Sequence, residues 1–66
     1  MMKEWKIVVD ATKAKEQGVN MISFMKEGKL VKSKVLFDCE ERIIYVEVPI
    51  EKPDVRERLI KLAHRC

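Results

Sequence analysis

The stretch VNMISFMKEGKLVKSKVLFD, residues 19–38, decides the fold, because it satisfies two different structural patterns. Read as strands, it folds back on itself at a tight turn around Glu27 and Gly28, and glycine supplies the positive φ that short hairpin loops require. Read as a helix, it continues a segment that starts before it, and residues 11–27 form one long helix that Gly28 ends. The choice sets both the number of strands and the topology.

The strand interpretation gives the second strand, residues 29–38, two mixed faces. Side chains alternate between the two faces of a strand. One face carries Val31, Ser33, Val35 and Phe37, and the other carries Leu30, Lys32, Lys34 and Leu36. Neither face is uniformly apolar, so the alternation alone does not prove a half-buried strand.

The helix interpretation gives a single apolar stripe, made of Ala11, Ala14, Gly18, Met21, Ile22 and Met25. Against it, Gly18, Val19 and Asn20 would lie in the helix interior, where each is a poor or mediocre helix former. We therefore favour the strands. One or two turns of helix, or a structured loop, are then expected between Asp10, a good N-cap, and Gly18, a suitable C-terminal stop.

The remaining segments have clearer patterns. WKIVVD at 5–10 is a β-branched run of strand length. RIIYVEV at 42–48 is a strong strand, and its continuous apolar run predicts a central position covered on both faces. Pro53 suits the first turn of a helix. An amphipathic C-terminal helix over about 53–65 follows from the spacing of Val55, Leu59, Leu62, Ala63 and Cys66.

The 66-residue chain predicts one small domain, residues 1–66, of the α+β class. We expect a small antiparallel β-sheet of three to four strands, with its hairpin at 26–29, packed by the C-terminal helix. The alternative is a β-α-β-β-α order with a long helix from 10 to 27. Its three-stranded sheet would need a partner on its edge or open face, which favours a dimer.

The charge is unevenly distributed along the chain. Formal net charge is +3, but residues 1–34 hold eight lysines against four acids, which is +4, and residues 35–66 hold six bases against seven acids, which is −1. Within the first part, KEGKLVKSK at 26–34 holds four lysines and one acid, Glu27, so it contributes +3. The basic excess therefore lies in the predicted hairpin.

Catalytic chemistry has no signature in this sequence. The single histidine, His64, falls in the last turn of the predicted terminal helix, without an orienting partner. Asp38, Glu40 and Glu41 cluster in a polar turn, which is typical of a solvated loop. Two glycines are too few for a phosphate-binding loop. We expect no enzyme, no catalytic residues and no cofactor.

The two cysteines, Cys39 and Cys66, do not match the paired spacing of a structural zinc site, so no metal is expected. A small secreted domain held by disulfides would carry more cysteines, and no signal-peptide pattern is visible. No apolar stretch approaches the roughly 18 residues that span a bilayer. We expect a cytoplasmic protein with reduced thiols and no membrane partner.

The basic hairpin predicts a small non-enzymatic binding protein that contacts DNA or RNA. Lysines can neutralise phosphates, and a two-stranded ribbon can enter a groove. The competing explanation is that lysines on edge strands only prevent aggregation. Lysine without nearby arginine predicts weak sequence preference and strong salt dependence. The candidate nucleic-acid-binding residues are Lys26, Lys29, Lys32, Lys34 and, if the first strand lies beside the hairpin, Lys6.

The alternative function is a protein–protein interaction or regulatory module, either a homodimer or a subunit of a complex. If the strand at 42–48 is apolar on both faces, one helix covers only one of them, and a second copy or a partner protein would cover the other. The competing explanation is that residues 11–25 fold back and cover that face within the monomer. In either case no small-molecule substrate is expected.

Overall fold

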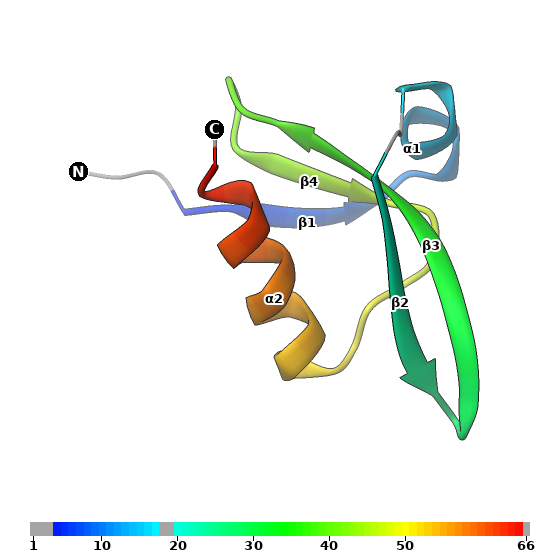
Figure 1. The fold of residues 1–66 in the computed structure, drawn as a ribbon. Coiled ribbons are helices and arrows are strands. Elements are labelled where there is room, and N and C mark those ends of the chain that lie inside the picture. The colour runs from blue at the N-terminus through cyan, green and yellow to red at the C-terminus, as the bar shows by residue number, and fades with distance from the viewer. Residues whose placement is uncertain (1–3, 18–19, 66) are drawn as a thin grey trace.

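The structure, a computed structural model, describes residues 4–17 and 20–65. It is an α+β fold, as predicted (Figure 1). The elements in chain order are β1 (Lys6–Val9), α1 (Ala11–Gln17), β2 (Asn20–Lys26), β3 (Lys29–Asp38), β4 (Ile43–Val46) and α2 (Pro53–Ala63). The β-α-β-β-α alternative with a helix from 10 to 27 is wrong, because β2 occupies residues 20–26.

The predicted hairpin at 26–29 is confirmed. Lys26 and Lys29 face each other across the turn, and the two central residues, Glu27 and Gly28, have φ of 52° and 77°. Positive φ at both central positions is the combination that a type I′ turn requires, and its twist matches that of the flanking strands. The local sequence therefore fixes the pairing of β2 with β3.

The sheet is mixed rather than purely antiparallel, which corrects the sequence prediction. Its strand order is β1-β4-β3-β2, and β1 runs parallel to β4 while the other pairs are antiparallel. The chain crosses from β1 at one margin to β2 at the other through α1, and then β3 and β4 return as antiparallel neighbours. β4 therefore arrives beside β1 in the same direction, as parallel pairs with a crossover connection do.

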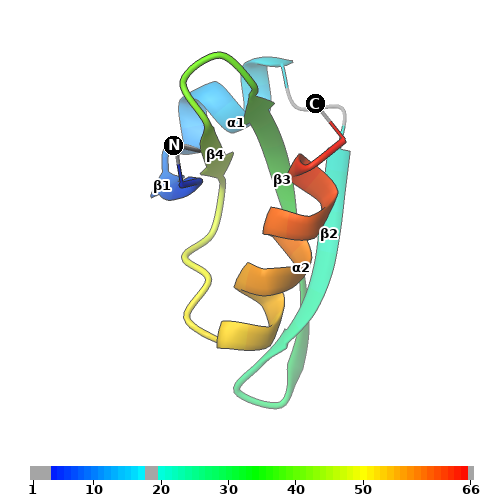
Figure 2. The same ribbon diagram turned by 90° about the vertical axis from the view of Figure 1, so that its left-hand side faces the viewer.

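The two helices lie on opposite faces of the sheet (Figure 2). On one face α2 closes the core, whose fully buried members are Val35, Ile44, Val46, Leu59 and Ala63. On the other face α1 packs over β3 and β4 through Ala14, which is also fully buried. Asp10 caps α1 as predicted, because its Oδ1 accepts a hydrogen bond from the backbone N–H of Lys13 at 3.0 Å.

The strand at β4 is central and buried on both faces, as its apolar run predicted. Ile44 and Val46 face α2, and Tyr45, which is also buried, lies on the face that α1 covers. The Nζ of Lys13 contacts the Tyr45 hydroxyl at 3.2 Å. The monomer therefore covers this face at Tyr45 with its own residues, which is the competing explanation given above, and β4 by itself gives no argument for a partner.

β3 is shared between two parts of the sheet. Residues 29–35 pair with β2, and residues 35–38 pair with β4, so only Val35 has a strand on each side. At the junction the buried Ser33 Oγ accepts hydrogen bonds from the N–H groups of Glu47 and Val48 at 3.1 and 3.2 Å. The hairpin continues beyond this junction as a separate two-stranded ribbon.

The C-terminal helix is confirmed over Pro53–Ala63, with Val55, Leu59 and Ala63 buried on one face. Cys66, predicted on the same face, lies outside the described residues. Cys39 is disulfide-bonded, so the prediction of reduced thiols is wrong for this residue. One support for a reducing compartment is therefore removed.

Candidate nucleic-acid interface

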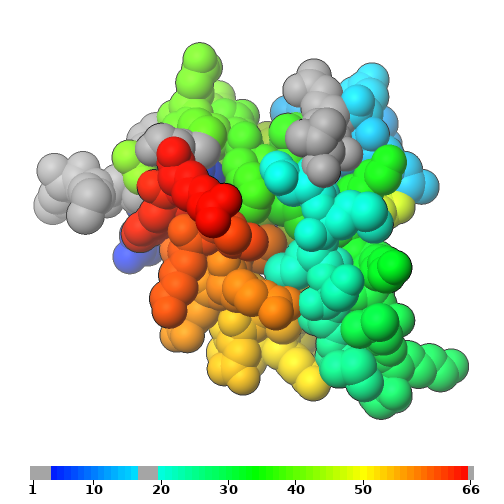
Figure 3. Space-filling model, in the orientation of Figure 1, coloured from blue at the N-terminus to red at the C-terminus, as the bar shows by residue number. Residues whose placement is uncertain are grey.

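The candidate interface is the ribbon, which we define as residues 20–34: β2 and the part of β3 that pairs with it alone. Its inner face packs towards α2 through Ile22 and Phe24, both buried. Its outer face points away from α2, and its tip extends beyond the rest of the fold (Figures 1 and 2). In the space-filling view the ribbon stands beside α2 with a notch between them (Figure 3).

The outer face is built from three cross-strand pairs. From the base of the ribbon to its tip they are Met21 with Lys34, Ser23 with Lys32, and Met25 with Leu30. Directly opposed residues share a face and lie close enough for their side chains to touch. Lysine heads and large apolar side chains are therefore mixed on this face, and Leu30 is 64% exposed.

The four ribbon lysines divide between its two faces. Lys32 and Lys34 belong to the outer face, whereas Lys26 and Lys29, one residue either side of the turn, share the alternation of the inner face. The structure therefore brings all four onto one narrow ribbon, with Lys34 at its base and the other three towards its tip, but does not place them in a single row. A ribbon that enters a groove tip-first would present lysine side chains to the phosphates on both sides of the groove.

Lys34 is the least available of the outer-face bases. It is half-buried, and its backbone N–H donates to Glu47 Oε2 at 3.2 Å. Glu47 also accepts the Nζ of Lys15 at 3.4 Å. The N–H of Lys34, together with Lys15, holds the pKa of the Glu47 carboxyl below its ordinary value. A carboxylate thus lies beside Lys34, whereas Lys29 and Lys32 are exposed.

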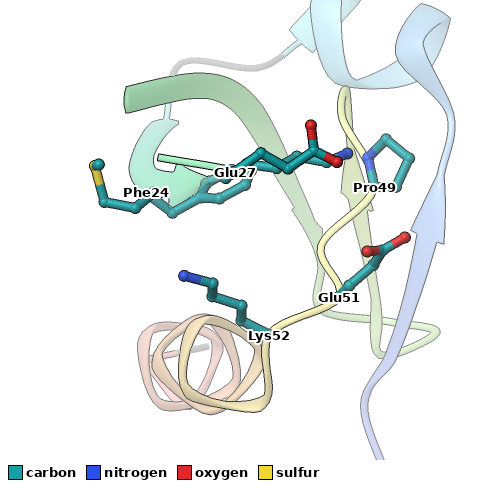
Figure 4. Close-up of a pocket in the computed structure, with 7 residues that line it drawn as sticks. Phe24, Glu27, Pro49, Glu51 and Lys52 are labelled. Carbon is teal, nitrogen blue, oxygen red and sulfur yellow. The ribbon is translucent and has the colours of Figure 1, made fainter. Parts of the chain in front are cut away.

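Lys26 is one of the residues that line a small pocket between the ribbon and the segment that leads into α2 (Figure 4). The pocket has a volume of about 160 Å³, and Phe24 and Pro49 supply its apolar walls. Its charged residues balance, because Lys26 and Lys52 are matched by Glu27 and Glu51. This pocket is therefore not an anion-binding site. It does bring Lys52 close to Lys26 and Glu27 of the ribbon.

Lys6 is not part of the ribbon surface. The first strand does not lie beside the hairpin, since β4 separates β1 from β3. Neighbouring strands are about 4.8 Å apart, so Lys6 lies at least about 10 Å from β3 by strand count alone. Along the sheet it is level with Ile43 and Asp38, at the end of β3 remote from the turn. The candidate set is therefore reduced to the ribbon lysines.

In the acidic turn that follows β3, the carboxylate of Asp38 binds backbone N–H groups of the turn itself. Asp38 Oδ1 accepts hydrogen bonds from the N–H groups of Glu40 and Glu41, each at 3.1 Å. His64 is exposed at the end of α2. Among residues 4–17 and 20–65, no group of three or more His, Cys, Asp and Glu side chains is placed to hold a metal ion.

Two features of the ribbon were missed by sequence reasoning. One is the apolar pair of Met25 and Leu30 at its tip, which the alternation of β3 could have indicated, since Leu30 shares a face with Lys32. The other is Arg58, whose Nη2 donates to the carbonyl oxygen of Ser23 at 2.7 Å. No sequence pattern links residues this far apart in the chain. The contact covers part of the free edge of β2.

Comparison with known proteins gives no relative from which to transfer a function. No protein-family model matches the chain, and neither the curated proteins nor the solved structures gave a match. No helix in the described part of the chain is long and apolar enough to cross a membrane. The function has to be argued from the surfaces of this chain itself.

Proposed function

We propose that this protein is a small non-enzymatic nucleic-acid-binding protein that uses the ribbon as its contact surface. The observation that carries the proposal is the charge of a projecting element: residues 26–34 hold four lysines and one acid, and they form the turn and one strand of a ribbon whose tip extends beyond the fold. A surface lysine on a compact face needs no explanation. A projecting segment of charge +3, with Lys29 and Lys32 exposed, is suited to approach a polyanion.

The chemistry of the ribbon favours contacts with the phosphate backbone. Lysine is a flexible point charge, whereas the planar fork of arginine is the better reader of base edges, and residues 20–34 contain no arginine. A two-stranded ribbon fits the roughly 12 Å width of a major groove. Binding should therefore position the protein on nucleic acid with little sequence preference and with an affinity that falls steeply with salt.

The proposal is tested by titrating labelled duplex DNA, single-stranded DNA and RNA with the protein at several salt concentrations, followed by fluorescence anisotropy. The test variant is Lys29→Glu with Lys32→Glu, which reverses the two exposed ribbon lysines. The matched control is Arg56→Glu with Lys61→Glu, which makes the same charge change on exposed positions of α2. Net charge is then equal in the two variants, and only its place differs.

The ribbon variant should lose binding at physiological salt, while the control keeps most of it. For the neutral substitutions Lys29→Gln and Lys32→Gln, the slope of log affinity against log salt should fall by about one per lysine removed. Equal losses in the ribbon and control variants would mean that net charge alone attracts the nucleic acid. Absence of binding by the unmodified protein at low salt would remove the proposal.

A second candidate is favoured by a different observation on the same element. Met21, Met25 and Leu30 are exposed large apolar side chains on the outer face of the ribbon. Exposed apolar side chains next to lysines suit an acidic amphipathic segment of a partner protein. Met25→Ser with Leu30→Ser separates the candidates, because it should abolish binding of such a partner and leave the salt-dependent phosphate contacts in place.

A further inference from the structure

The edge strand β1 has backbone groups that point away from the sheet. It pairs with β4 on one side, and no described residue forms a strand on its other side. The N–H of Lys6 donates to the carbonyl of Arg42 and that of Asp10 to the carbonyl of Val46, each at 3.0 Å. Since alternate residues of a strand turn to opposite sides, the N–H and C=O groups of Ile7 and Val9 face outward.

This edge lacks the protection found at the opposite margin of the sheet. At β2 the side chain of Arg58 donates a hydrogen bond to the carbonyl oxygen of Ser23. Along β1, by contrast, Val8 and Val9 are 39% and 53% exposed, and the strand KIVV has no proline. Natural edge strands are usually blunted by short length, lysines, proline, bulges, covering side chains or inward charges. Of these, β1 has its four-residue length and Lys6, and in the register proposed below Lys6 faces an acid instead of repelling the second strand. An open β-branched edge is suited to receive another strand.

We propose that β1 pairs with β1 of a second copy of this chain, antiparallel and centred on Val8. In this register Val8 lies opposite the partner's Val8, and Ile7 lies opposite the partner's Val9. Ile7 and Val9 are the residues with outward-facing backbone groups, so each such pair exchanges both of its hydrogen bonds. The side chain of Lys6 then lies opposite the partner's Asp10, once at each end of the contact.

The charge pairing selects this register over its neighbours. Moving the two-fold axis to Ile7 or Val9 keeps the hydrogen-bonding parity but shortens the overlap of the two strands. It also places Lys6 opposite an apolar residue or beyond the contact. Opposite charges facing each other across strands stabilise a pair, and like charges destabilise it. Only the register centred on Val8 combines full overlap of residues 6–9 with two Lys6–Asp10 pairs.

The product is a continuous sheet of eight strands, four from each copy. A two-fold axis perpendicular to the sheet keeps both α2 helices on one face and both α1 helices on the other. The two ribbons then lie at the two outer margins. The contact is short and falls at the small, transient end of protein interfaces, so the dimer should form in a concentration-dependent manner. This inference does not depend on nucleic-acid binding.

Sedimentation equilibrium of the isolated protein from about 1 µM to about 1 mM, without nucleic acid, tests the inference. The test variants are Val8→Lys, which opposes two lysines at the axis, and Lys6→Glu, which faces the partner's Asp10 with a like charge. Lys61→Glu makes the same charge change on exposed α2 and serves as the control. Circular dichroism of each variant verifies that the monomer is folded.

Unmodified protein should show a monomer–dimer equilibrium. Both β1 variants should weaken it by at least about tenfold, and Lys61→Glu should not. If Val8→Lys fails to fold, Lys6→Glu still decides, because Lys6 is exposed. Monomer at every concentration would overturn the inference, and so would a dimer whose dissociation constant is unchanged in a folded β1 variant, since the contact would then lie elsewhere.

Discussion

The two ends of β3 belong to one continuous strand but differ in the strands and helices that surround them. From Val35 to Asp38 the strand pairs with β4, and at Val35 also with the end of β2, with α2 on one face and α1 on the other. From Lys29 to Ser33 it has only β2 as a neighbour, α2 on one side, and an open outer face. The end from Val35 to Asp38 is the more buried of the two, and the end from Lys29 to Ser33 carries the lysines.

This difference teaches how a short chain divides its tasks. In a domain of this size the core contains few side chains, so stability depends on each of them. The ribbon tip contributes little apolar burial, and its residues are free to be selected for binding. Substitutions should therefore separate cleanly into those that change the free energy of unfolding and those that change only recognition.

The largest effect is expected from truncation at the buried end. Ile44→Ala removes a fully buried side chain from the centre of the sheet and should lower the free energy of unfolding by about 2–5 kcal/mol. Leu30→Ala, at the exposed tip, should change it by less than about 0.5 kcal/mol. Urea unfolding followed by circular dichroism measures both. Should Ile44→Ala not fold, Ile44→Val replaces it with an expected loss of about 0.5–1.5 kcal/mol. Similar losses at the two ends would refute the division.

The next effect is expected at the junction between the two ends. Ser33→Ala removes the acceptor of the Val48 N–H, and the N–H of Glu47 keeps only the Lys34 carbonyl at 3.2 Å. One part-buried donor left without its partner should cost about 1–3 kcal/mol. Ser23→Ala, on the exposed outer face, is the control and should change stability by less than about 0.5 kcal/mol. An unaffected Ser33→Ala variant would mean that the hydroxyl does not hold the junction.

Two substitutions in the turn should move stability in opposite directions. Glu27 has a positive φ, which asparagine tolerates better than glutamate, so Glu27→Asn should stabilise the hairpin by roughly 0.5–1 kcal/mol. Gly28→Ala should destabilise it, and only through the backbone, because an added Cβ would meet no atom within 4 Å. Thermal unfolding measures both.

Glu27→Asn also removes the one acid of residues 26–34 and raises their charge from +3 to +4, so it should tighten nucleic-acid binding. Weaker binding by a stabilised Glu27→Asn variant would contradict the phosphate-contact account.

The smallest effect is a pH dependence carried by Glu47. Its pKa in the folded protein is below the ordinary value of 4.5, because the N–H of Lys34 and the ammonium of Lys15 favour the charged carboxylate. Its contribution to stability is therefore present above the ordinary pKa and is lost as pH falls through the lower folded pKa. Glu47→Gln should flatten the decline of unfolding midpoint below pH 4.5 relative to the parent. Parallel curves for the two proteins would show that Glu47 does not carry this dependence.

Local signals in the sequence predicted the elements well and their arrangement less well. Gly28 indicated the turn, Pro53 the start of α2, and the apolar run in β4 its central position. The parallel pairing of β1 with β4 was not predictable in the same way, because it depends on where α1 delivers the chain. Lys6 was included in the candidate set on the condition that β1 lies beside the hairpin, and the strand order does not meet that condition.

The alternation of side chains along β3 already indicates which face each lysine lies on, and the sequence prediction of the site did not use this. Lys29 and Lys32 differ in parity along β3, so their separation onto two faces follows from the strand period alone. The contact of Arg58 with Ser23 and the disulfide bond of Cys39 are different. They depend on tertiary proximity, and neither residue lies in a motif that would reveal it. Binding surfaces built from one hairpin are thus the most accessible to sequence reasoning.

The central claim is that the ribbon tip is the nucleic-acid contact, and a backbone-amide NMR titration with a short DNA duplex tests it most directly. Isotopically labelled protein is titrated at low salt, and the shifted amides are mapped onto the fold. The account predicts that shifts concentrate between residues 21 and 34, are largest around Lys29 and Lys32, and disappear as salt is raised. Shifts concentrated on α2 or β1 with a quiet ribbon, or no shifts at all, would contradict it.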